Sequence, residues 1–348
     1  MTNPQLGLNR EISPTVATDH WVGRRVLVTG ATGLIGSWLT RRLIELGSHV
    51  VVLVQDLDPQ SELVRSGTIL RASVVNGELE DFRAIERAIN REETDTVFHL
   101  GAQTLVGAAQ RAPLATFEAN IRGTYNLLEA CRVNPAVVQR VIVASSDKAY
   151  GEHAQLPYTE STPLQGREPY AVSKTCTDLI SQTYAASYNL PVVIARCGNV
   201  YGGGDLNWSR IVPGTIRSLL EGRSPVIRSD GTYLRDYIYV HDVVDGYLKL
   251  CESLDDPERR GVAYNISTEE ALTVVELVSK ICSIMGCEAM PLDIRATAQG
   301  EIHDQHLSAE KARRELGWKP EFGLHHGLAA TVDWYRAFLA GRTPGPIA

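Results

Sequence analysis

The 348-residue chain is predicted to fold as an α/β protein, a doubly wound parallel sheet followed by a smaller C-terminal lobe. Short apolar runs rich in β-branched residues alternate with segments that have the 3.6-residue apolar spacing of helices. Such alternation is typical of a parallel sheet with helices on both faces. The runs are apolar throughout, as expected of central strands that are buried on both sides.

The first strand–helix–strand unit is the clearest part of this pattern. RVLVT at 25–29 and HVVVLV at 49–54 flank the segment SWLTRRLIELG, whose helical spacing ends at Gly47. The remaining elements are predicted as strands at 72–75, 96–100, 140–145 and 191–196 and as helices at 81–90, 115–132 and 168–187.

The alternation of strands and helices ends at about residue 203. Glycine and proline loops, aromatic-rich segments and a helix at 271–286 follow. We expect residues 1–20 to be an N-terminal extension and residues 21–202 to form the sheet domain, which also receives part of 235–262. Residues 203–348 are then mainly a lobe that closes over the carboxyl edge of the sheet and binds substrate.

Composition narrows the classes of partner. The formal net charge of −7 disfavours nucleic acid and anionic membranes, which bind through clustered Lys and Arg. The six cysteines are scattered and lack metal-site spacing, so we expect no metal, no disulfide framework and a reducing cytoplasm. No uncharged apolar run reaches roughly eighteen residues, so no membrane span is expected either. The expected partners are a small molecule and a second copy of the chain.

VTGATGLIG places Gly30, Gly33 and Gly36 between the first strand and its helix. The first glycine permits a tight turn, the second lets the backbone approach a pyrophosphate, and the helix N-terminus offers N–H groups to the phosphates. This pattern predicts a Rossmann sheet that binds a dinucleotide. The further backbone contacts expected here come from Thr32, Leu34, Ile35, Leu100, Gly101 and Ala102.

The second strand is followed by Gln55 and Asp56, with no arginine nearby to meet a 2′-phosphate. An acid at this strand end grips the adenosine ribose, so NAD is favoured over NADP, although Gln55 could occupy the position of the usual acid. In NGELED, Glu78 and Leu79 are predicted to lie at the adenine. The alternative for Glu78 is a solvated loop.

YAVSK puts Tyr170 and Lys174 four residues apart, on one face of a helix. Tyrosine has a pKa of about 10. A neighbouring ammonium and a positive nicotinamide would favour its phenolate, which is a competent base.

The motifs of the whole chain resemble the extended short-chain dehydrogenase/reductases, in the branch that acts on nucleotide sugars. The resemblance rests on FHLGAQ, NIRGTYNLLEA, SSDKAYG, PYAVSK, RCGNVYGGGD, RDYIYVHD, YNIS and LGWKP, in this order. It implies an NAD-dependent enzyme whose substrate is a nucleotide-diphosphate sugar.

The resemblance also implies roles for individual residues. Ser146 would hydrogen-bond the sugar hydroxyl, Tyr170 would take its proton while hydride leaves C4, and Lys174 would hold the nicotinamide ribose. The residues implied to bind substrate are Gln103, Asn199, Arg210 and Arg235, the last three near the diphosphate.

Three positions depart from the family pattern. Gly101 stands where alanine is usual, YNIS lacks a following glycine, and Gln305 and His306 lie near where an arginine often grips the diphosphate. These departures concern nucleotide binding more than the oxidation chemistry.

Asp147 and Lys148 follow Ser146 directly. A 4-epimerase needs no acid or base here, whereas the dehydratases of the family carry an acid and then Glu or Lys. By that resemblance Asp147 would protonate the C6 oxygen and Lys148 would take the C5 proton. Burial favours the neutral forms that these roles need, while the mutual attraction of the two charges opposes them.

The resemblance therefore implies a nucleotide-sugar 4,6-dehydratase. SSDK with GNVYGGGD and SRIVP is most similar to the group that acts on CDP-glucose. A 4-epimerase or uronate decarboxylase with a structural Asp–Lys pair, and an idle NAD-sensing protein, remain alternatives. The helices at 115–132 and 168–187 resemble a family homodimer interface, although their apolar stripes also suit core packing.

Overall fold

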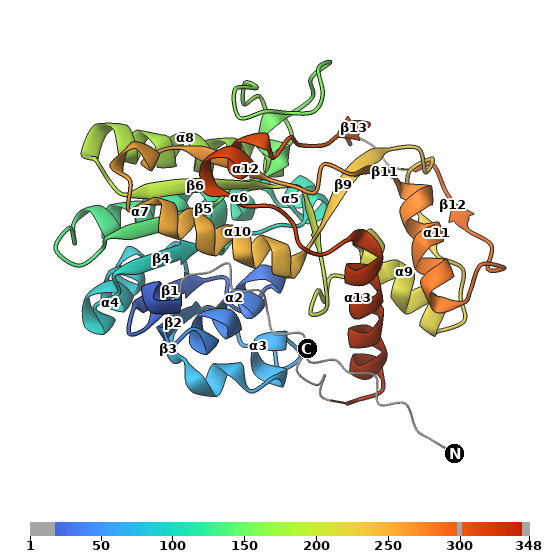
Figure 1. Cartoon of the computed structure of the whole chain (residues 1–348), viewed down its shortest axis with the longest axis horizontal. Coiled ribbons are helices and arrows are strands. Elements are labelled where there is room, and N and C mark those ends of the chain that lie inside the picture. Colours follow the sequence, from blue (N-terminus) through green and yellow to red (C-terminus); the bar gives the residue numbers. More distant parts are fainter. Residues whose placement is uncertain (1–17, 298–300, 343–348) are drawn as a thin grey trace.

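The computed structural model describes residues 18–297 and 301–342. Its central sheet consists of β1 (Arg25–Thr29), β2 (His49–Val54), β3 (Ser73–Asn76), β4 (Thr96–His99), β5 (Arg140–Ala144), β6 (Val192–Cys197) and β10 (Ala263–Ile266). These seven strands are all parallel and lie in the order β10-β6-β5-β4-β1-β2-β3 (Figure 1). The predicted α/β class with a parallel Rossmann sheet is confirmed.

Helices cover both faces of this sheet, because successive strand residues point to opposite sides. The covering helices are α2 (Leu34–Glu45) and α10 (Val240–Ser253) on one face, and α4 (Phe82–Glu92), α7 (Gly123–Arg132) and α8 (Pro169–Tyr188) on the other. In β1, Val26 and Val28 join the core beneath α2 and α10, whereas Leu27 joins the core beneath α4, α7 and α8. The sheet is therefore buried on both sides, as its uninterrupted apolar strands require.

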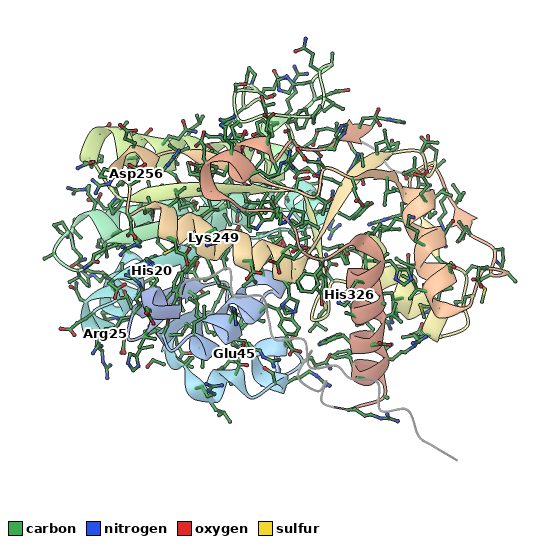
Figure 2. All side chains as sticks on the ribbon, viewed as in Figure 1. His20, Arg25, Glu45, Lys249, Asp256 and His326 are labelled. Atoms are coloured by element: carbon green, nitrogen blue, oxygen red, sulfur yellow. The ribbon has the colours of Figure 1, made fainter. Side chains whose placement is uncertain are left out.

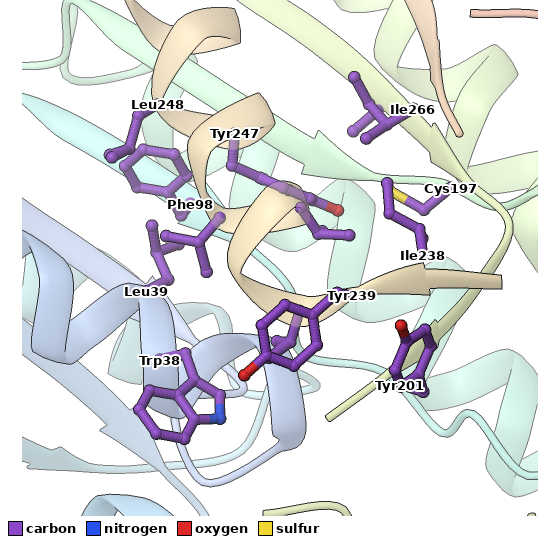
Figure 3. Packing of buried hydrophobic residues seen from close by; sticks show 14 of the residues in the cluster. Trp38, Leu39, Phe98, Cys197, Tyr201, Ile238, Tyr239, Tyr247, Leu248 and Ile266 are labelled. Carbon is purple, nitrogen blue, oxygen red and sulfur yellow. The ribbon is translucent and has the colours of Figure 1, made fainter. Parts of the chain in front are cut away.

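Figure 3 shows how α2 and α10 close the first face. Trp38 and Leu39 from α2 and Tyr247 and Leu248 from α10 pack with Phe98 of β4 in one hydrophobic cluster. All five side chains are at least 96% buried. Burial of side chains of this size stabilises a fold by roughly 1.5–3 kcal/mol each.

The outward side of α10 is polar, so the helix is amphipathic. Lys249 donates to Glu252 at 3.1 Å across one turn of the helix (Figure 2). Just beyond the helix, the exposed side chain of Asp256 accepts from the Glu258 N–H at 3.0 Å and starts a short 3₁₀ turn. The Lys249–Glu252 pair is half-buried, whereas the Asp256 contact is exposed and contributes little to stability.

A smaller group of strands and helices lies beyond the carboxyl edge of the sheet, on the right of Figure 1. It contains β7 (Asn199–Tyr201), β8 (Val226–Ile227), β9 (Leu234–Tyr239), β11 (Ala271–Thr273), β12 (Asp293–Ile294), β13 (Asp304–Gln305), α9 (Ile211–Leu220), α11 (Val274–Met285) and α13 (Leu324–Leu339). β9 pairs with β7, β11 and β13. Between these pieces the chain returns to the large sheet, where β10 pairs with β6 and α12 (Glu310–Leu316) packs on β10.

The long helix expected at 115–132 is interrupted. The structure has α6 (Pro113–Phe117), a π-helical turn at Glu118–Arg122 and then α7. Within the π turn the Asn120 side chain accepts from the Gln103 N–H at 2.7 Å and donates to Ser173 Oγ at 2.9 Å. A π turn changes the direction in which a side chain leaves a helix. Here it directs the Asn120 amide to the loop after β4.

The helix expected at 271–286 begins later, at Val274. Residues Ala271–Thr273 pair antiparallel with β9 instead, and Thr273 forms a capping box with Glu276. A Thr followed three residues later by a Glu is typical of a helix start, so this boundary could have been predicted from the sequence. Other short elements are α1 (Thr18–Trp21), α3 (Glu62–Arg65), η1 (Thr68–Arg71) and α5 (Val106–Arg111). Of the predicted N-terminal extension, residues 1–17 lie outside the described residues.

Candidate active site

The glycine-rich turn joins β1 to α2 in a shape that only glycine permits. Gly30 has φ +70°, in the left-handed region. A Cβ on Gly36 would lie 2.1 Å from the Gly30 carbonyl oxygen, so the first turn of the helix packs directly on the strand end. Gly33 precedes α2 and makes no side-chain cap, which leaves the N–H groups around Leu34 and Ile35 available to an anion.

The turn borders the crevice where the strand order reverses, between β1 and β4. Ligands of doubly wound sheets bind at this switch point. A Cβ on Gly30 would lie 2.7 Å from the Gly101 nitrogen, so the two strand ends are in close contact. Leu100, Gly101 and Ala102, predicted from sequence, are partly exposed at this place. The site therefore has the form that a dinucleotide pyrophosphate requires.

Local packing explains why glycine rather than alanine stands at position 101. A Cβ there would lie 2.9 Å from Leu79 Cδ1 and 3.1 Å from Thr29 Oγ1. Thr29 accepts from the Gly101 N–H at 3.0 Å and also contacts buried His99, whose pKa burial lowers to about 3. The departure from alanine thus fits the packing of Leu79 and Thr29 under the crevice.

The ends of β2 and β3 carry the side chains predicted to meet the adenosine. Gln55 donates to Glu78 at 3.4 Å, and both residues and Asp56 are exposed, whereas Leu79 is half-buried. The carboxylates of Asp56 and Glu78 suit ribose hydroxyls and oppose a 2′-phosphate. These residues fit NAD.

Replacing Gly36 by Ala should weaken NAD binding by about tenfold, the equivalent of roughly 1.4 kcal/mol. The added methyl would collide with the Gly30 carbonyl and push the turn out of its phosphate-binding shape. Overpacking of this kind also costs about 1–3 kcal/mol of stability. A fluorescence titration with NAD and a thermal melt measure both effects. Gly323→Ala is the control, since a Cβ there meets nothing within 4 Å; equal NAD affinity in both variants would refute the assignment.

A serine, a tyrosine and a lysine meet at the ends of β5 and α8. Ser146 lies two residues after β5 and is buried, while Tyr170 and Lys174 lie one turn apart near the start of α8. Lys174 Nζ donates to the Ala144 carbonyl at 2.9 Å, and burial lowers its pKa to about 8. Tyr170 and Lys174, linked by their spacing, and Ser146, added by the family resemblance, are thus brought to one edge of the sheet.

Tyr170 differs from expectation in this structure. Burial and the nearby Asp147 carboxylate raise its pKa to about 12, although a hydrogen bond with Ser146 opposes the shift. The expected influence of Lys174 is weaker because its ammonium is directed to the Ala144 carbonyl. The phenol is therefore protonated at neutral pH in the absence of further positive charge.

Buried Asp147 and half-buried Lys148 form an ion pair beside Ser146. Lys148 Nζ donates to Asp147 Oδ2 at 3.3 Å, and Ser146 Oγ donates to Asp147 Oδ1 at 2.8 Å. The Asp147 side chain is 4% exposed and that of Lys148 is 24% exposed. Burial lowers the pKa of Lys148, and Asp147 partly offsets this while Arg235 adds to it.

The four predicted substrate residues lie at two places. Gln103 and Arg210 lie close together, because Arg210 donates to Thr104 Oγ1 at 3.1 Å as well as to Asp205 at 2.9 Å. Asn199 on β7 donates to the Asp236 carbonyl of β9 at 3.1 Å.

Arg235, predicted to meet the diphosphate, is largely engaged with backbone. Its guanidinium donates to the carbonyls of Leu234 at 2.8 Å and His303 at 2.7 Å, and also to that of Ile302. This arginine therefore fastens the 302–303 segment to β9, and its diphosphate role stays a prediction.

Most of the chain matches the model of one protein family. Residues 26–267 match the model described as the NAD dependent epimerase/dehydratase family. The chain belongs to this family. Its members depend on NAD, so the predictions of an enzyme and of NAD as its cofactor are confirmed.

Individual relatives of the NAD-dependent epimerase/dehydratase family are similar over almost the whole chain. CDP-glucose 4,6-dehydratase of Salmonella typhimurium is 30% identical over 93% of this chain and 93% of its own. A dTDP-glucose 4,6-dehydratase of Streptomyces venezuelae, solved with NAD bound, is 29% identical, with a TM-score of 0.82 over 92% of this chain and 99% of its own. UDP-glucose 4-epimerase of Thermotoga maritima, solved with UDP-glucose, is 29% identical, with a TM-score of 0.80 over 90% of this chain and 99% of its own.

Two residues near the pair were not assigned to it from sequence. Gln305, noted only as a family departure, accepts from Lys148 Nζ and donates to the Asp147 carbonyl at 2.9 Å. Asp236 is buried, and burial together with Asp147 raises its pKa to about 6. A carboxylate inside the buried strand LRDYIY was the available signal for Asp236. Gln305 gave no such signal, because its partners lie more than 150 residues away.

Within residues 18–297 and 301–342, no group of three or more His, Cys, Asp or Glu side chains is placed to hold a metal ion. No helix in these ranges has the length and apolar character needed to cross a membrane.

Proposed function

We propose that the protein is a nucleotide-sugar 4,6-dehydratase that uses NAD, with CDP-glucose as the leading substrate. The observation that carries this proposal is the ion pair between buried Asp147 and half-buried Lys148, beside Ser146. Oxidation at C4 needs a hydrogen-bond donor and a base, which Ser146 and Tyr170 supply. Asp147 and Lys148 are not required for that step. The similarity to CDP-glucose 4,6-dehydratase over 93% of both chains supports the same choice.

The first half of the reaction uses the residues of β5 and α8. Ser146 holds the C4 hydroxyl of the sugar, and Tyr170 accepts its proton. When bound, NAD supplies the hydride acceptor for C4 and a positive charge that favours the Tyr170 phenolate. Lys174, held on the Ala144 carbonyl at 2.9 Å, is placed to meet the nicotinamide ribose.

The second half removes water from the 4-keto sugar. The keto group acidifies the C5 hydrogen, which Lys148 takes as a proton. Asp147 gives a proton to the C6 oxygen as the C6–O bond breaks, so one water leaves and a C5–C6 double bond forms. Lys148 then returns its proton to C5, and bound reduced nicotinamide would supply the hydride for C6. The proton that Tyr170 took from the C4 hydroxyl replaces the one that Asp147 gave, so the 4-keto-6-deoxy product forms with no net redox change. The lowered pKa of Lys148 favours the neutral amine that this step requires.

Fold similarity does not separate this proposal from epimerisation, since a 4-epimerase and a dehydratase superpose with TM-scores of 0.80 and 0.82. The test is incubation with the CDP, dTDP, UDP and GDP forms of glucose, with GDP-mannose and with UDP-glucuronate, followed by alkali. A 4-keto-6-deoxy product gives a new absorbance under alkali, and we expect it with CDP-glucose. An inverted C4 centre would show an epimerase, loss of carbon dioxide from a uronate would show a decarboxylase, and NAD binding without any turnover would show a sensing protein.

We also propose a homodimer formed through α7 and α8. Tyr125 of α7 is 42% exposed, and Leu179 and Tyr188 of α8 are 49% and 55% exposed. Neighbouring helices that expose apolar side chains suit a packed interface better than water. The reducing cytoplasm is the proposed location, because all six cysteines are free thiols.

Replacing Leu179 by Glu is expected to convert the dimer to a monomer, because a carboxylate would be buried at the interface without a partner. Light scattering during gel filtration measures the mass. Leu70→Glu is the matched control, since Leu70 is 88% exposed and lies on η1, away from α7 and α8. A wild-type protein that is already monomeric, or a Leu179→Glu dimer, would overturn the proposed interface.

A further inference from the structure

A side-chain amide bridges the two members of the acid–base pair. Gln305 lies on β13 and is 0% exposed. Its Oε1 accepts a hydrogen bond from Lys148 Nζ, and its Nε2 donates to the Asp147 carbonyl at 2.9 Å. Both polar ends of one buried side chain are therefore used on adjacent residues of the SSDK turn.

We propose that Gln305 is a positioning residue for the elimination step, which fixes the direction in which Lys148 takes and returns a proton. The inference rests on the proposed dehydratase function. An ammonium carries three N–H donors. Two of them are committed, one to Asp147 at 3.3 Å and one to Gln305. Transfer of the proton shared with Asp147 to that carboxylate gives the neutral amine and the protonated acid that elimination needs, while the N–H bond to Gln305 holds the amine nitrogen in its orientation.

The amide can hold this direction because its own backbone is fixed on both sides. Gln305 pairs in parallel with Arg235 of β9. On the other side, the Tyr158 N–H donates to the His306 carbonyl at 2.9 Å, and the Ser308 N–H donates to the Tyr158 carbonyl at 2.8 Å. A side chain held between two paired segments loses little further entropy when it orients a catalytic group.

The neutrality of the amide matters as much as its position. The charged groups that act on Lys148 are Asp147 in the same turn and Arg235 and Asp236 on β9, and the phenols of Tyr158 and Tyr170 lie near Asp147. A carboxylate at position 305 would add negative charge at the ammonium and keep it protonated. An amide accepts the N–H bond without adding charge, so burial can still favour the free amine.

Two substitutions separate direction from charge. In Gln305→Met, which keeps the length but removes both hydrogen bonds, elimination should slow by about tenfold to one hundredfold, part of the typical general-base contribution. In Gln305→Glu, the pH at which elimination reaches half its maximum should move upward, because the added carboxylate raises the pKa of Lys148 and the base must be neutral. C4 oxidation, followed by the absorbance of reduced nicotinamide, should stay near wild type in both variants. Ser308→Ala is the control, since its hydroxyl donates to Glu269 rather than to the pair.

The outcomes are distinct. If elimination in Gln305→Met equals that of Ser308→Ala and the pH profile of Gln305→Glu equals that of wild type, Gln305 has no positioning role. A Met variant that is destabilised in thermal melts leaves the Glu variant to decide by its pH profile, which a merely structural role would not move. If the wild-type enzyme eliminates no water from any nucleotide sugar, the proposed function fails instead.

Discussion

Replacement of Lys148 by Met should slow elimination of water by about 10²- to 10⁴-fold, the usual contribution of a general base. Methionine fills a similar space but cannot accept the C5 proton. Oxidation at C4 should proceed, because Ser146, Tyr170 and Lys174 remain in place. The variant should therefore form reduced nicotinamide on mixing with substrate and then stall, which stopped-flow absorbance and the alkali assay distinguish.

The companion change, Asp147→Asn, removes the acid at C6 and should also block elimination. It takes away the carboxylate that raises the pKa of Lys148, so any residual elimination should show its half-maximal rate at lower pH. Lys249→Met is the matched control, since this half-buried lysine lies on α10 (Figure 2) and donates to Glu252 rather than to the pair. Full dehydratase turnover in Lys148→Met would contradict the assignment of Lys148 as the base at C5.

The pH profile of the wild-type enzyme follows from the same residue. Lys148 acts as a base only when neutral, so elimination should rise with pH through its pKa. Burial lowers this pKa from the ordinary lysine value of about 10.4, and the nearby Arg235 acts in the same direction. The rising limb of the profile is therefore expected below the ordinary lysine range, and it should be absent from Lys148→Met.

Replacement of Tyr170 by Phe should abolish both halves of the reaction, because no product can form before C4 is oxidised. The expected loss is again about 10²- to 10⁴-fold. The structure sharpens this prediction, since burial and Asp147 raise the Tyr170 pKa to about 12 and the phenolate forms only with added positive charge. Reduced nicotinamide should not appear on mixing, in contrast to Lys148→Met.

Binding should separate a chemical role of Tyr170 from a structural one. Removing one hydroxyl leaves the glycine-rich turn and α8 intact, so NAD affinity and thermal stability should stay near wild type. Tyr264→Phe serves as the control for loss of a hydroxyl, because the Tyr264 hydroxyl donates to Glu315 at 3.0 Å and accepts from Arg259 at 3.2 Å. Retained C4 oxidation in Tyr170→Phe would contradict the assignment of the base.

Much of the fold and part of the site could be predicted because they depend on local pattern. β1, α2 and β2 have clear apolar periodicity. The glycine spacing between β1 and α2 is typical of dinucleotide binding. Ser146 and Tyr170 could be linked in advance only through the family resemblance, because Ser146 follows β5 and Tyr170 lies on α8. The family resemblance extended this reading to the acid–base pair, whose burial the structure then showed.

The rest depends on contacts between distant segments. Gln305 reaches Lys148 only because β13 pairs with β9, and no local pattern predicts that pairing. Arg235 could be assigned to a diphosphate by motif, but in the structure its guanidinium holds the carbonyls of Ile302 and His303. The π turn at Glu118–Arg122 likewise follows from the partners of Asn120 and not from the apolar spacing of the helix.

The measurement that tests the central claim most directly follows one hydrogen atom. CDP-glucose carrying deuterium at C4 is incubated with the enzyme, and the product is examined by mass spectrometry and NMR. A 4,6-dehydratase should lose one water and carry the deuterium at C6 of a 4-keto-6-deoxy sugar. Deuterium that remains at C4 of an intact hexose, with that centre inverted, would show an epimerase and contradict the role proposed for Asp147 and Lys148.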